Sequence, residues 1–265
     1  MDPSAYLDIN RKSWNDRVDL HMQSEFYDLD AFLQGKCSLQ PLEVELLGSL
    51  AGVKLLHLQC HFGQDSISLA RRGANVTGVD LSDKGIEAAK ELAKKTGQDA
   101  TFICCDVCNL PPSLDASFDL AFTSYGVLGW LPDLSKWASA VAKTLRPGGR
   151  LVLVEFHPLL WMYDNAFKSI AYDYFNTGPI RETETGSYAE PDANIVLETM
   201  SWNHPLSDAI SSLLDAGFQL NHFAEYDYSP YPCFSFVEAS GPGKFRIRGL
   251  NRRVPMLYSL IARKS

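Results

Sequence analysis

The chain has 265 residues, 46% of them hydrophobic, which suffices to bury the core of one large domain or of one domain with an insertion. Its formal net charge of −8 argues against nucleic acid as a partner, because binding to a phosphate backbone requires a basic face. The opening MDPSAYLDINRKSWNDR is charged where a secretion signal is apolar, and no apolar run approaches the roughly 18 residues of a membrane span, so we expect a cytoplasmic protein without a membrane partner.

The N-terminal part of the chain, residues 1–45, is expected to be a helical segment that precedes the main domain at 46–265. Within it, the stretch NRKSWNDRVDLHMQSEFYD is predicted to form a helix before the sheet begins.

Strand and helix signals alternate through the next hundred residues or so. A strand predicted at 53–59 leads into a helix at 64–72, which Gly73 can close, and Ser82 is the candidate N-cap of the following helix. The other predicted elements are the strands NVTGVD, DATFICCD, FDLAFTSY and RLVLVEF and the helix DLSKWASAVAKTL. Repeated units of this kind imply a parallel sheet covered on both faces, with right-handed crossovers.

The alternation stops after His157, and residues 158–203 form an aromatic-rich insertion without clean periodicity. Such a segment is either a packing element, which forms a small core of its own or a dimer contact, or a lid over a substrate. Both interpretations stay open. A helix at PLSDAISSLLDAG, a strand near 218–226 and a strand in VPMLYSLIARK follow it. The last two strands, joined by a long loop, suit an antiparallel pair at the sheet edge.

Ligands of open parallel sheets bind beyond the carboxyl ends of the strands, so the turn QCHFGQ after the first strand is a candidate site. A nicotinamide dinucleotide usually requires G-x-G-x-x-G there, and this turn has one glycine. His57, Cys60 and His61 have a spacing that could hold a metal, but adjacent strand residues point to opposite faces. CCDVC has no second cysteine pair, so buried free thiols are expected there, and we predict no metal.

Five stretches, in order, carry a specific resemblance: LLHLQCHFGQD, VTGVDLS, CDVCNLP, FDLAFTSYGVLGWLPDL and LRPGGRLVLVEF. Together they resemble the class I S-adenosylmethionine-dependent methyltransferases, over about residues 50–157 and more loosely to the end. The resemblance implies an α/β, Rossmann-like, doubly wound sheet of seven mostly parallel strands with an antiparallel last strand. The aromatic-rich insertion would follow the fifth strand.

The resemblance also implies a role for the residues at the strand ends. Asp80 would accept both ribose hydroxyls, although it could instead cap the helix beside Ser82. Asp106 would accept from the adenine amino group, with a simple turn aspartate as the alternative. The full expected set of S-adenosylmethionine-binding residues is Gln59, Cys60, His61, Gly63, Asp80, Leu81, Asp106, Val107, Ser124 and Tyr125.

The first turn departs from the family pattern. The family commonly has an acidic residue where His57 stands and glycines where Gln59 and His61 stand. The acid helps to hold the ammonium group of the cofactor, and the side-chain carbonyl of Gln59 could partly replace it. We interpret the stretch as a modified cofactor turn rather than a metal site. In this fold the N-terminal segment often closes over the cofactor, so Trp14, Phe26 and Tyr27 either cover it or pack on the sheet edge.

Methyl transfer is an in-line displacement, which needs no acid or base when the acceptor has a free lone pair. If the acceptor must lose a proton, His157 is the first candidate base, with Tyr125 and His204 behind it and a core or capping role as the alternative for both histidines. Candidate substrate-binding residues are Trp130, His157, Trp161 and Tyr174.

The sequence therefore predicts a methyltransferase (EC 2.1.1.-) acting on a small-molecule acceptor, with a homodimer as a possible assembly. The alternative is an S-adenosylmethionine-binding protein without transferase activity that uses the insertion as a partner surface. Fold-level resemblance cannot name the acceptor.

Overall fold

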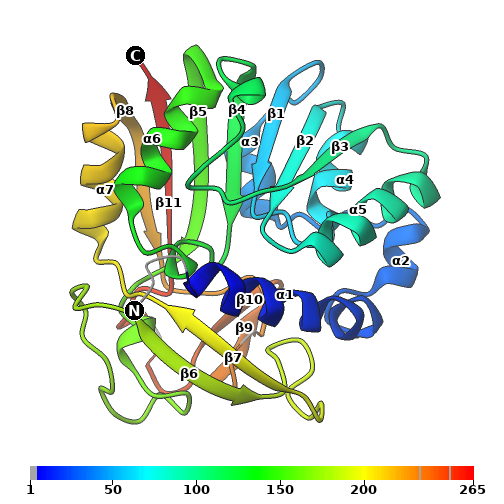
Figure 1. Ribbon diagram of the computed structural model, residues 1–265. Helices are drawn as coiled ribbons and strands as arrows, with labels where there is room; N and C mark the ends of the chain where they lie inside the picture. The colour runs from blue at the N-terminus through cyan, green and yellow to red at the C-terminus, as the bar shows by residue number, and fades with distance from the viewer. Residues whose placement is uncertain (1–4, 233, 251) are drawn as a thin grey trace.

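The computed structural model describes residues 5–232, 234–250 and 252–265, and its main body has three layers, with a central sheet between two layers of helices (Figure 1). The first four residues of the predicted N-terminal segment lie outside the described residues. Smaller hairpins lie beyond the carboxyl ends of the parallel strands, and helix α1 (Ala5–Gln23) crosses between them and the sheet.

Seven strands of the described chain form the main sheet, in the order β3-β2-β1-β4-β5-β11-β8. Only β11 is antiparallel to its neighbours in this sheet, β5 and β8. The predicted sheet, mostly parallel with an antiparallel last strand, is thereby confirmed. The strands are β1 (Lys54–Leu58), β2 (Asn75–Asp80), β3 (Ala100–Cys104), β4 (Phe118–Ser124), β5 (Leu145–Phe156), β8 (Phe218–Tyr226) and β11 (Leu257–Lys264).

The helices begin and end largely where the sequence signals stand. The Ser82 hydroxyl accepts a hydrogen bond from Gly85 N at 2.8 Å, and Gly97 ends the same helix in a left-handed conformation. Asp133 caps α6 through Lys136 N at 3.0 Å. The helices after α1 are α2 (Leu29–Leu33), α3 (Pro41–Leu47), α4 (Gln64–Arg71), α5 (Asp83–Thr96), α6 (Leu134–Thr144) and α7 (Leu206–Asp215). The boundary predicted after residue 45 falls within α3.

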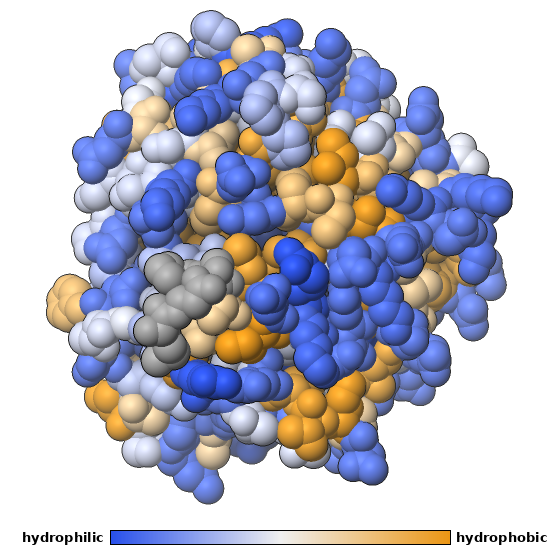
Figure 2. All heavy atoms as spheres, viewed as in Figure 1, coloured by the Kyte–Doolittle hydropathy of each residue, from blue (hydrophilic) through white to orange (hydrophobic). Residues whose placement is uncertain are grey.

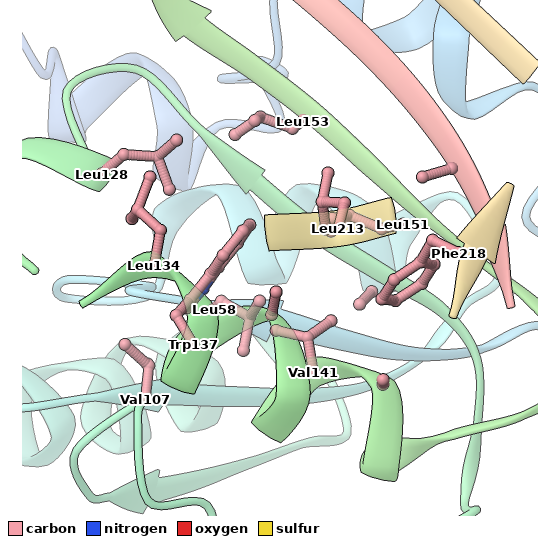
Figure 3. Close-up of a cluster of buried hydrophobic side chains, with 14 of the residues drawn as sticks. Leu58, Val107, Leu128, Leu134, Trp137, Val141, Leu151, Leu153, Leu213 and Phe218 are labelled. Carbon is pink, nitrogen blue, oxygen red and sulfur yellow. The ribbon is translucent and has the colours of Figure 1, made fainter. Parts of the chain in front are cut away.

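Hydrophobic cores lie on both faces of the sheet. Successive side chains of the central strands point to opposite faces, and each face is covered by apolar side chains. Helices α6 and α7 pack on one face, where Trp137 is fully buried against side chains such as Leu58 and Leu153 (Figure 3). Helices α3, α4 and α5 cover the other face, where strand residues such as Leu55 and Val152 are buried. A strand that is buried on both faces has a continuous apolar sequence, as in RLVLVEF.

The insertion contains an antiparallel hairpin of β6 (Ile180–Thr185) and β7 (Val196–Ser201). A second hairpin, β9 (Val237–Gly241) and β10 (Lys244–Ile247), lies in the loop between β8 and β11. Short 3₁₀ helices occur at Pro112–Leu114, Leu128–Trp130 and Leu160–Met162. On the face seen in Figure 2 the surface is mostly hydrophilic, with hydrophobic atoms gathered beside α1.

Among the helices of the described residues, none has the length and apolar character that a membrane crossing requires. Of the cysteines in CCDVC, Cys105 and Cys108 are partly buried. The expectation of buried thiols is wrong for Cys104, which is exposed because it ends the edge strand β3. Cys233 lies outside the described residues.

Candidate active site

The turn after β1 keeps its conformation without the usual glycines. Gln59 and His61 have φ angles of 53° and 51°, a left-handed region that side chains other than glycine rarely adopt. The His61 N–H donates to Asp80 Oδ2 at 2.8 Å, and the Gln59 amide donates to Val127 O at 2.8 Å. These contacts hold two strained residues in place.

Gly63 serves helix packing as well as the turn. Its φ is 79°, and a Cβ placed on it would lie 2.7 Å from the Ala89 Cβ and 2.9 Å from the Phe102 ring. A side chain here would therefore push α5 away from the start of α4. Gly63, one of the ten expected cofactor-binding residues, is thus also required for the packing of the protein itself.

His57 is a structural residue of β1. Its ring stacks on Phe122, its Nδ1 lies 2.7 Å from Ser66 Oγ, and its side chain is buried. Burial lowers the pKa of His57 to about 3, so the imidazole is neutral at physiological pH. His57 thus ties β1 to α4 and provides no carboxylate toward the turn.

The metal interpretation gains no geometric support. The His57 ring is bound to Ser66, whereas the His61 ring is bound to His21. Among the described residues, no group of three or more His, Cys, Asp or Glu side chains could hold a metal ion. The absence of a bound metal stays a prediction.

Asp80 joins the first and second turns at the carboxyl end of β2. Its Oδ2 accepts from His61 N and its Oδ1 from Ser82 N, both at 2.8 Å. Burial raises the pKa of this carboxyl, while the two backbone donors and Leu81 N lower it. A carboxylate oxygen has two lone pairs, so each oxygen can accept a second hydrogen bond from a ligand hydroxyl.

The turn after the third strand adds further residues to the site. Asp106 Oδ1 accepts from Cys108 N at 2.9 Å, which shapes the turn, and Val107 beside it is buried. Cys105 N donates to Asp80 O at 2.9 Å, so the turns after β2 and β3 are held together. Leu81, Asp106 and Val107 all line the same cavity as Asp80.

That cavity has a volume of about 870 Å³, within the usual range of ligand sites, and lies at the carboxyl ends of the parallel strands. All ten expected cofactor residues line it. Trp130 and Trp161 also line it, as do Trp14, Phe26 and Tyr27 of the N-terminal segment. Residues that sequence reasoning predicted separately therefore meet in one place.

Three predicted residues are placed differently. His157 Nε2 lies 3.0 Å from Glu225 Oε1, and its Nδ1 accepts from Leu159 N. His204 Nε2 lies 2.7 Å from Leu131 O, and the Tyr174 hydroxyl accepts from Leu206 N. None of these three residues is among those that line the cavity. Strand β5 ends with Phe156 toward the site, so the next residue turns to the opposite side.

A chain of two histidines and a serine crosses from the first turn to the insertion. His61 Nε2 lies 2.9 Å from His21 Nδ1, and His21 Nε2 lies 2.7 Å from Ser187 Oγ. Burial lowers the pKa of His21 to about 3 and that of His61 well below its ordinary value, so both rings are neutral at physiological pH. His61 Nδ1 has no hydrogen-bond partner among the described residues.

Tyr125 follows β4 in a left-handed conformation, with φ 52°. Its hydroxyl is buried without a partner among the described residues, and burial raises the pKa of the phenol well above its usual value. Glu155 on the neighbouring strand accepts hydrogen bonds from the backbone N–H groups of Gly126, Val127 and Leu128 at 2.5–2.9 Å. This buried carboxylate sets the loop after β4 and hence the position of Tyr125.

Sequence reasoning missed several residues of the site. Glu155 left one signal, an acidic residue inside the apolar run RLVLVEF. Arg17 and Glu43, which line the cavity, and His21, which contacts His61, left none, because their positions depend on contacts with distant elements. Arg17 is almost fully buried and its guanidinium lies 5.2 Å from the Trp14 ring centroid.

Comparisons with known proteins agree with this geometry. Residues 56–153 match the family model of a methyltransferase domain. A ubiquinone biosynthesis O-methyltransferase of Alkalilimnicola ehrlichii is 26% identical over 215 residues, or 74% of this chain and 85% of that protein. The chain is therefore similar to class I S-adenosylmethionine-dependent methyltransferases, with a match to a methyltransferase domain at residues 56–153.

Two further likenesses give the extent of the match. The protein of the same name from Idiomarina loihiensis is 31% identical over 134 residues, or 49% of this chain and 55% of that protein. The crystal structure of an S-adenosylmethionine-dependent methyltransferase from Mesorhizobium loti has a TM-score of 0.58 at 20% identity, covering 88% of this chain and 100% of that chain. The alignments span about half the length of the first curated relatives.

The residues present fit the cofactor of this family. The buried Asp80 carboxylate keeps free lone pairs toward the cavity, as a ribose diol requires. Val107 and Leu81 supply apolar walls beside Asp106, as a purine ring requires.

Proposed function

We propose that the protein is an S-adenosylmethionine-dependent methyltransferase that acts on a small-molecule acceptor in the cytoplasm. The observation that carries this proposal is one cavity in which Asp80, Asp106 and the end of β4 lie together under an aromatic cover. Asp80 would hold the ribose and Asp106 the adenine amino group, with Ser124 and Tyr125 toward the methionine end.

When bound, S-adenosylmethionine supplies a methyl group on a sulfonium, which passes to a lone pair of the acceptor as the carbon–sulfur bond breaks and its electrons return to sulfur. The protein's residues position the acceptor and exclude water. Trp14, Trp130 and Trp161 supply apolar walls for this purpose, and they come from the N-terminal helix, the loop after β4 and the insertion. These walls favour an acceptor with an aromatic or other apolar body.

For an acceptor hydroxyl that must lose its proton, we propose His61 as the base. With His61 Nε2–H donated to His21 and His21 Nε2–H donated to Ser187, the lone pair on His61 Nδ1 is left available to the acceptor. Burial keeps the ring neutral at physiological pH, so this lone pair carries no proton, and the contact with His21 fixes the tautomer of the ring. His157 and His204 are less suitable because neither lines the cavity, and both ring nitrogens of His157 already have protein partners.

Calorimetric titration with S-adenosylhomocysteine and with NADH tests the cofactor. We expect saturable one-to-one binding of S-adenosylhomocysteine and none of NADH. A folded protein that does not bind S-adenosylhomocysteine would overturn the proposed function.

A panel of phenols, amines, thiols and carboxylates with methyl-labelled S-adenosylmethionine tests the transfer. His61→Asn should keep S-adenosylhomocysteine binding within a few-fold and lower transfer to a phenol by about 10²–10⁴-fold, the usual contribution of a positioned base. An unchanged rate in the His61→Asn variant would remove His61 from the mechanism.

The second candidate function is S-adenosylmethionine binding without transfer, with the insertion as a partner surface. The insertion exposes apolar side chains that a second copy of the chain or another protein could cover, namely Ile170, Phe175 and Val196. Binding without turnover across all four acceptor classes would favour this function. Light scattering with and without Phe175→Ser shows whether this surface forms a homodimer.

A further inference from the structure

Glu43 places a buried carboxyl group in the cavity, and one of its two oxygens lacks a hydrogen-bond partner of normal geometry among the described residues. The residue lies in the first turn of α3, where its Oε2 accepts from Gln40 N at 2.6 Å. Its side chain is 1% exposed, and it lines the same cavity as the candidate cofactor residues. Glu43 Oε1 has no hydrogen-bond partner of normal geometry among the described residues, although the Ser124 hydroxyl is close enough to favour the ionised carboxyl.

Two other hydrogen-bond acceptors line the same cavity. Asp65, in the first turn of α4, lines the cavity, and its negative charge opposes ionisation of Glu43. The side-chain carbonyl of Gln59, Oε1, is also buried without a partner among the described residues, because the Gln59 amide N–H is donated to Val127. Carboxylate and amide oxygens accept hydrogen bonds and do not donate them, so the ligand group that meets them must be a donor.

The order of strands places these acceptors at one end of the bound cofactor. Asp106 follows β3 and Asp80 follows β2, whereas Ser124 follows β4, on the other side of β1. Adenine over β3 and ribose over β2 therefore leave the amino-acid end over β1 and β4. Glu43 is close to Ser124, and its charge also acts on Tyr125.

We propose that Glu43, with Asp65 and the Gln59 carbonyl, binds the ammonium group of the amino-acid end of S-adenosylmethionine. This inference rests on the proposed function. It assigns binding of the ammonium group to a residue of α3, because His57, which stands where the family commonly has an acidic residue, is neutral and bound to Ser66. An ammonium group supplies three donors and a positive charge, which match the acceptors and the negative charge around them.

A ligand pair isolates the ammonium contact. S-adenosylhomocysteine has the adenine, the ribose and the amino acid, whereas 5′-methylthioadenosine has the first two only. In calorimetric titrations at pH 8, Glu43→Gln should weaken S-adenosylhomocysteine binding by about tenfold or more and change methylthioadenosine binding by less than twofold. Asp65→Asn should show the same selectivity with a smaller effect.

Matched variants separate the outcomes. Glu45→Gln removes an exposed carboxyl from the same helix and should change neither affinity. Asp80→Ala should weaken both ligands, because both contain the ribose. Equal effects of Glu43→Gln on both ligands would overturn the ammonium assignment and leave the proposed function intact. Failure of the wild-type protein to bind either ligand would overturn both.

The wild-type protein offers a test without substitution. Burial, and next the charge of Asp65, raise the pKa of Glu43 to about 8 in the free protein. Ammonium binding favours the ionised carboxyl, so S-adenosylhomocysteine affinity relative to methylthioadenosine should rise between pH 6 and 8, by up to about tenfold per pH unit. Asp65 and Tyr125 also face Glu43, whereas His57 and His61 stay neutral over this range. A pH-independent affinity ratio would contradict the proposal.

Discussion

Gln59 and His61 show how single residues replace the glycines that the family usually has in its first turn. A left-handed conformation costs a side-chain-bearing residue on the order of 1 kcal/mol or more, so other contacts must maintain it. The Asp80 carboxylate supplies one such contact by accepting from His61 N. Asp80 therefore stabilises the turn itself and remains able to bind a ligand.

Replacing Asp80 tests both tasks. Asp80→Ala should weaken S-adenosylhomocysteine binding at least tenfold, since about 1.4 kcal/mol corresponds to that factor and hydrogen bonds to a charged group contribute roughly 1.5–3 kcal/mol. The melting temperature of the free protein should fall by a few degrees, because His61 N–H and Ser82 N–H lose their acceptor. Asp115→Ala, at an exposed site outside the cavity, is the control. Unchanged binding in Asp80→Ala would remove the ribose assignment.

Helix α1 differs from the other long helices because the side chains it buries are mostly polar. Its buried residues recur every three or four positions, as in an amphipathic helix, but they include Asn10, Ser13, Arg17 and His21. Arg17 lines the cavity, whereas the His21 ring contacts His61 and Ser187, so neither side chain belongs to an apolar core. A hydrophobic pattern therefore cannot reveal which face of this helix is buried.

Asn10 attaches α1 to the insertion. Its side chain donates to Met200 O at 2.8 Å and accepts from Met200 N at 2.9 Å, across 190 residues of sequence. Asn10→Ala should cost about 1–3 kcal/mol, because two buried backbone groups lose their partner. Hydrogen exchange should accelerate in α1 and β7 and stay unchanged in β1 and β4.

Asp8→Ala, an exposed change on the same helix, should leave exchange in β7 as it is. Equal acceleration in all strands of the Asn10→Ala variant would show global destabilisation, and α1 would not be a separately anchored cover.

Across the whole molecule, carboxyl groups are buried where the strands end. Burial raises the pKa values of Glu43, Asp65, Asp80 and Glu155 above those of exposed carboxyls. Such groups disfavour the folded state when they ionise, and a ligand with positive charge or hydrogen-bond donors offsets that cost. If Glu43 binds the ammonium group as proposed, its ionisation lowers the stability of the free protein in the same pH range in which it favours ligand binding.

The sign of this effect can be measured for Glu43. Its pKa rises from 4.5 to about 8 on folding, so the stability that it contributes is full below pH 4.5 and is lost as the pH rises through 8. The melting temperature of the ligand-free wild type, relative to Glu43→Gln, should therefore decrease between pH 5.5 and 8.5. A difference that does not change with pH would show that Glu43 is already ionised in the free protein.

The sequence by itself determined the order of the elements and the residues that close the turns of the sheet. Apolar runs, the Ser82 cap and Gly97 act within a few residues, so their effect can be read locally. Asp80 and Asp106 could be placed for the same reason, since each directly follows a short strand whose end the pattern shows.

Tertiary structure decided which other side chains enter the cavity. His157 follows a correctly predicted strand, yet its ring binds Glu225, which lies 68 residues away. Glu43 enters the cavity because α3 packs beside β5, and His21 meets His61 because α1 crosses the strand ends. Such contacts depend on how separate elements pack, which local periodicity does not contain. For this reason the positions of the candidate cofactor residues after the strands could be predicted, whereas those of the residues of α1 and α3 could not.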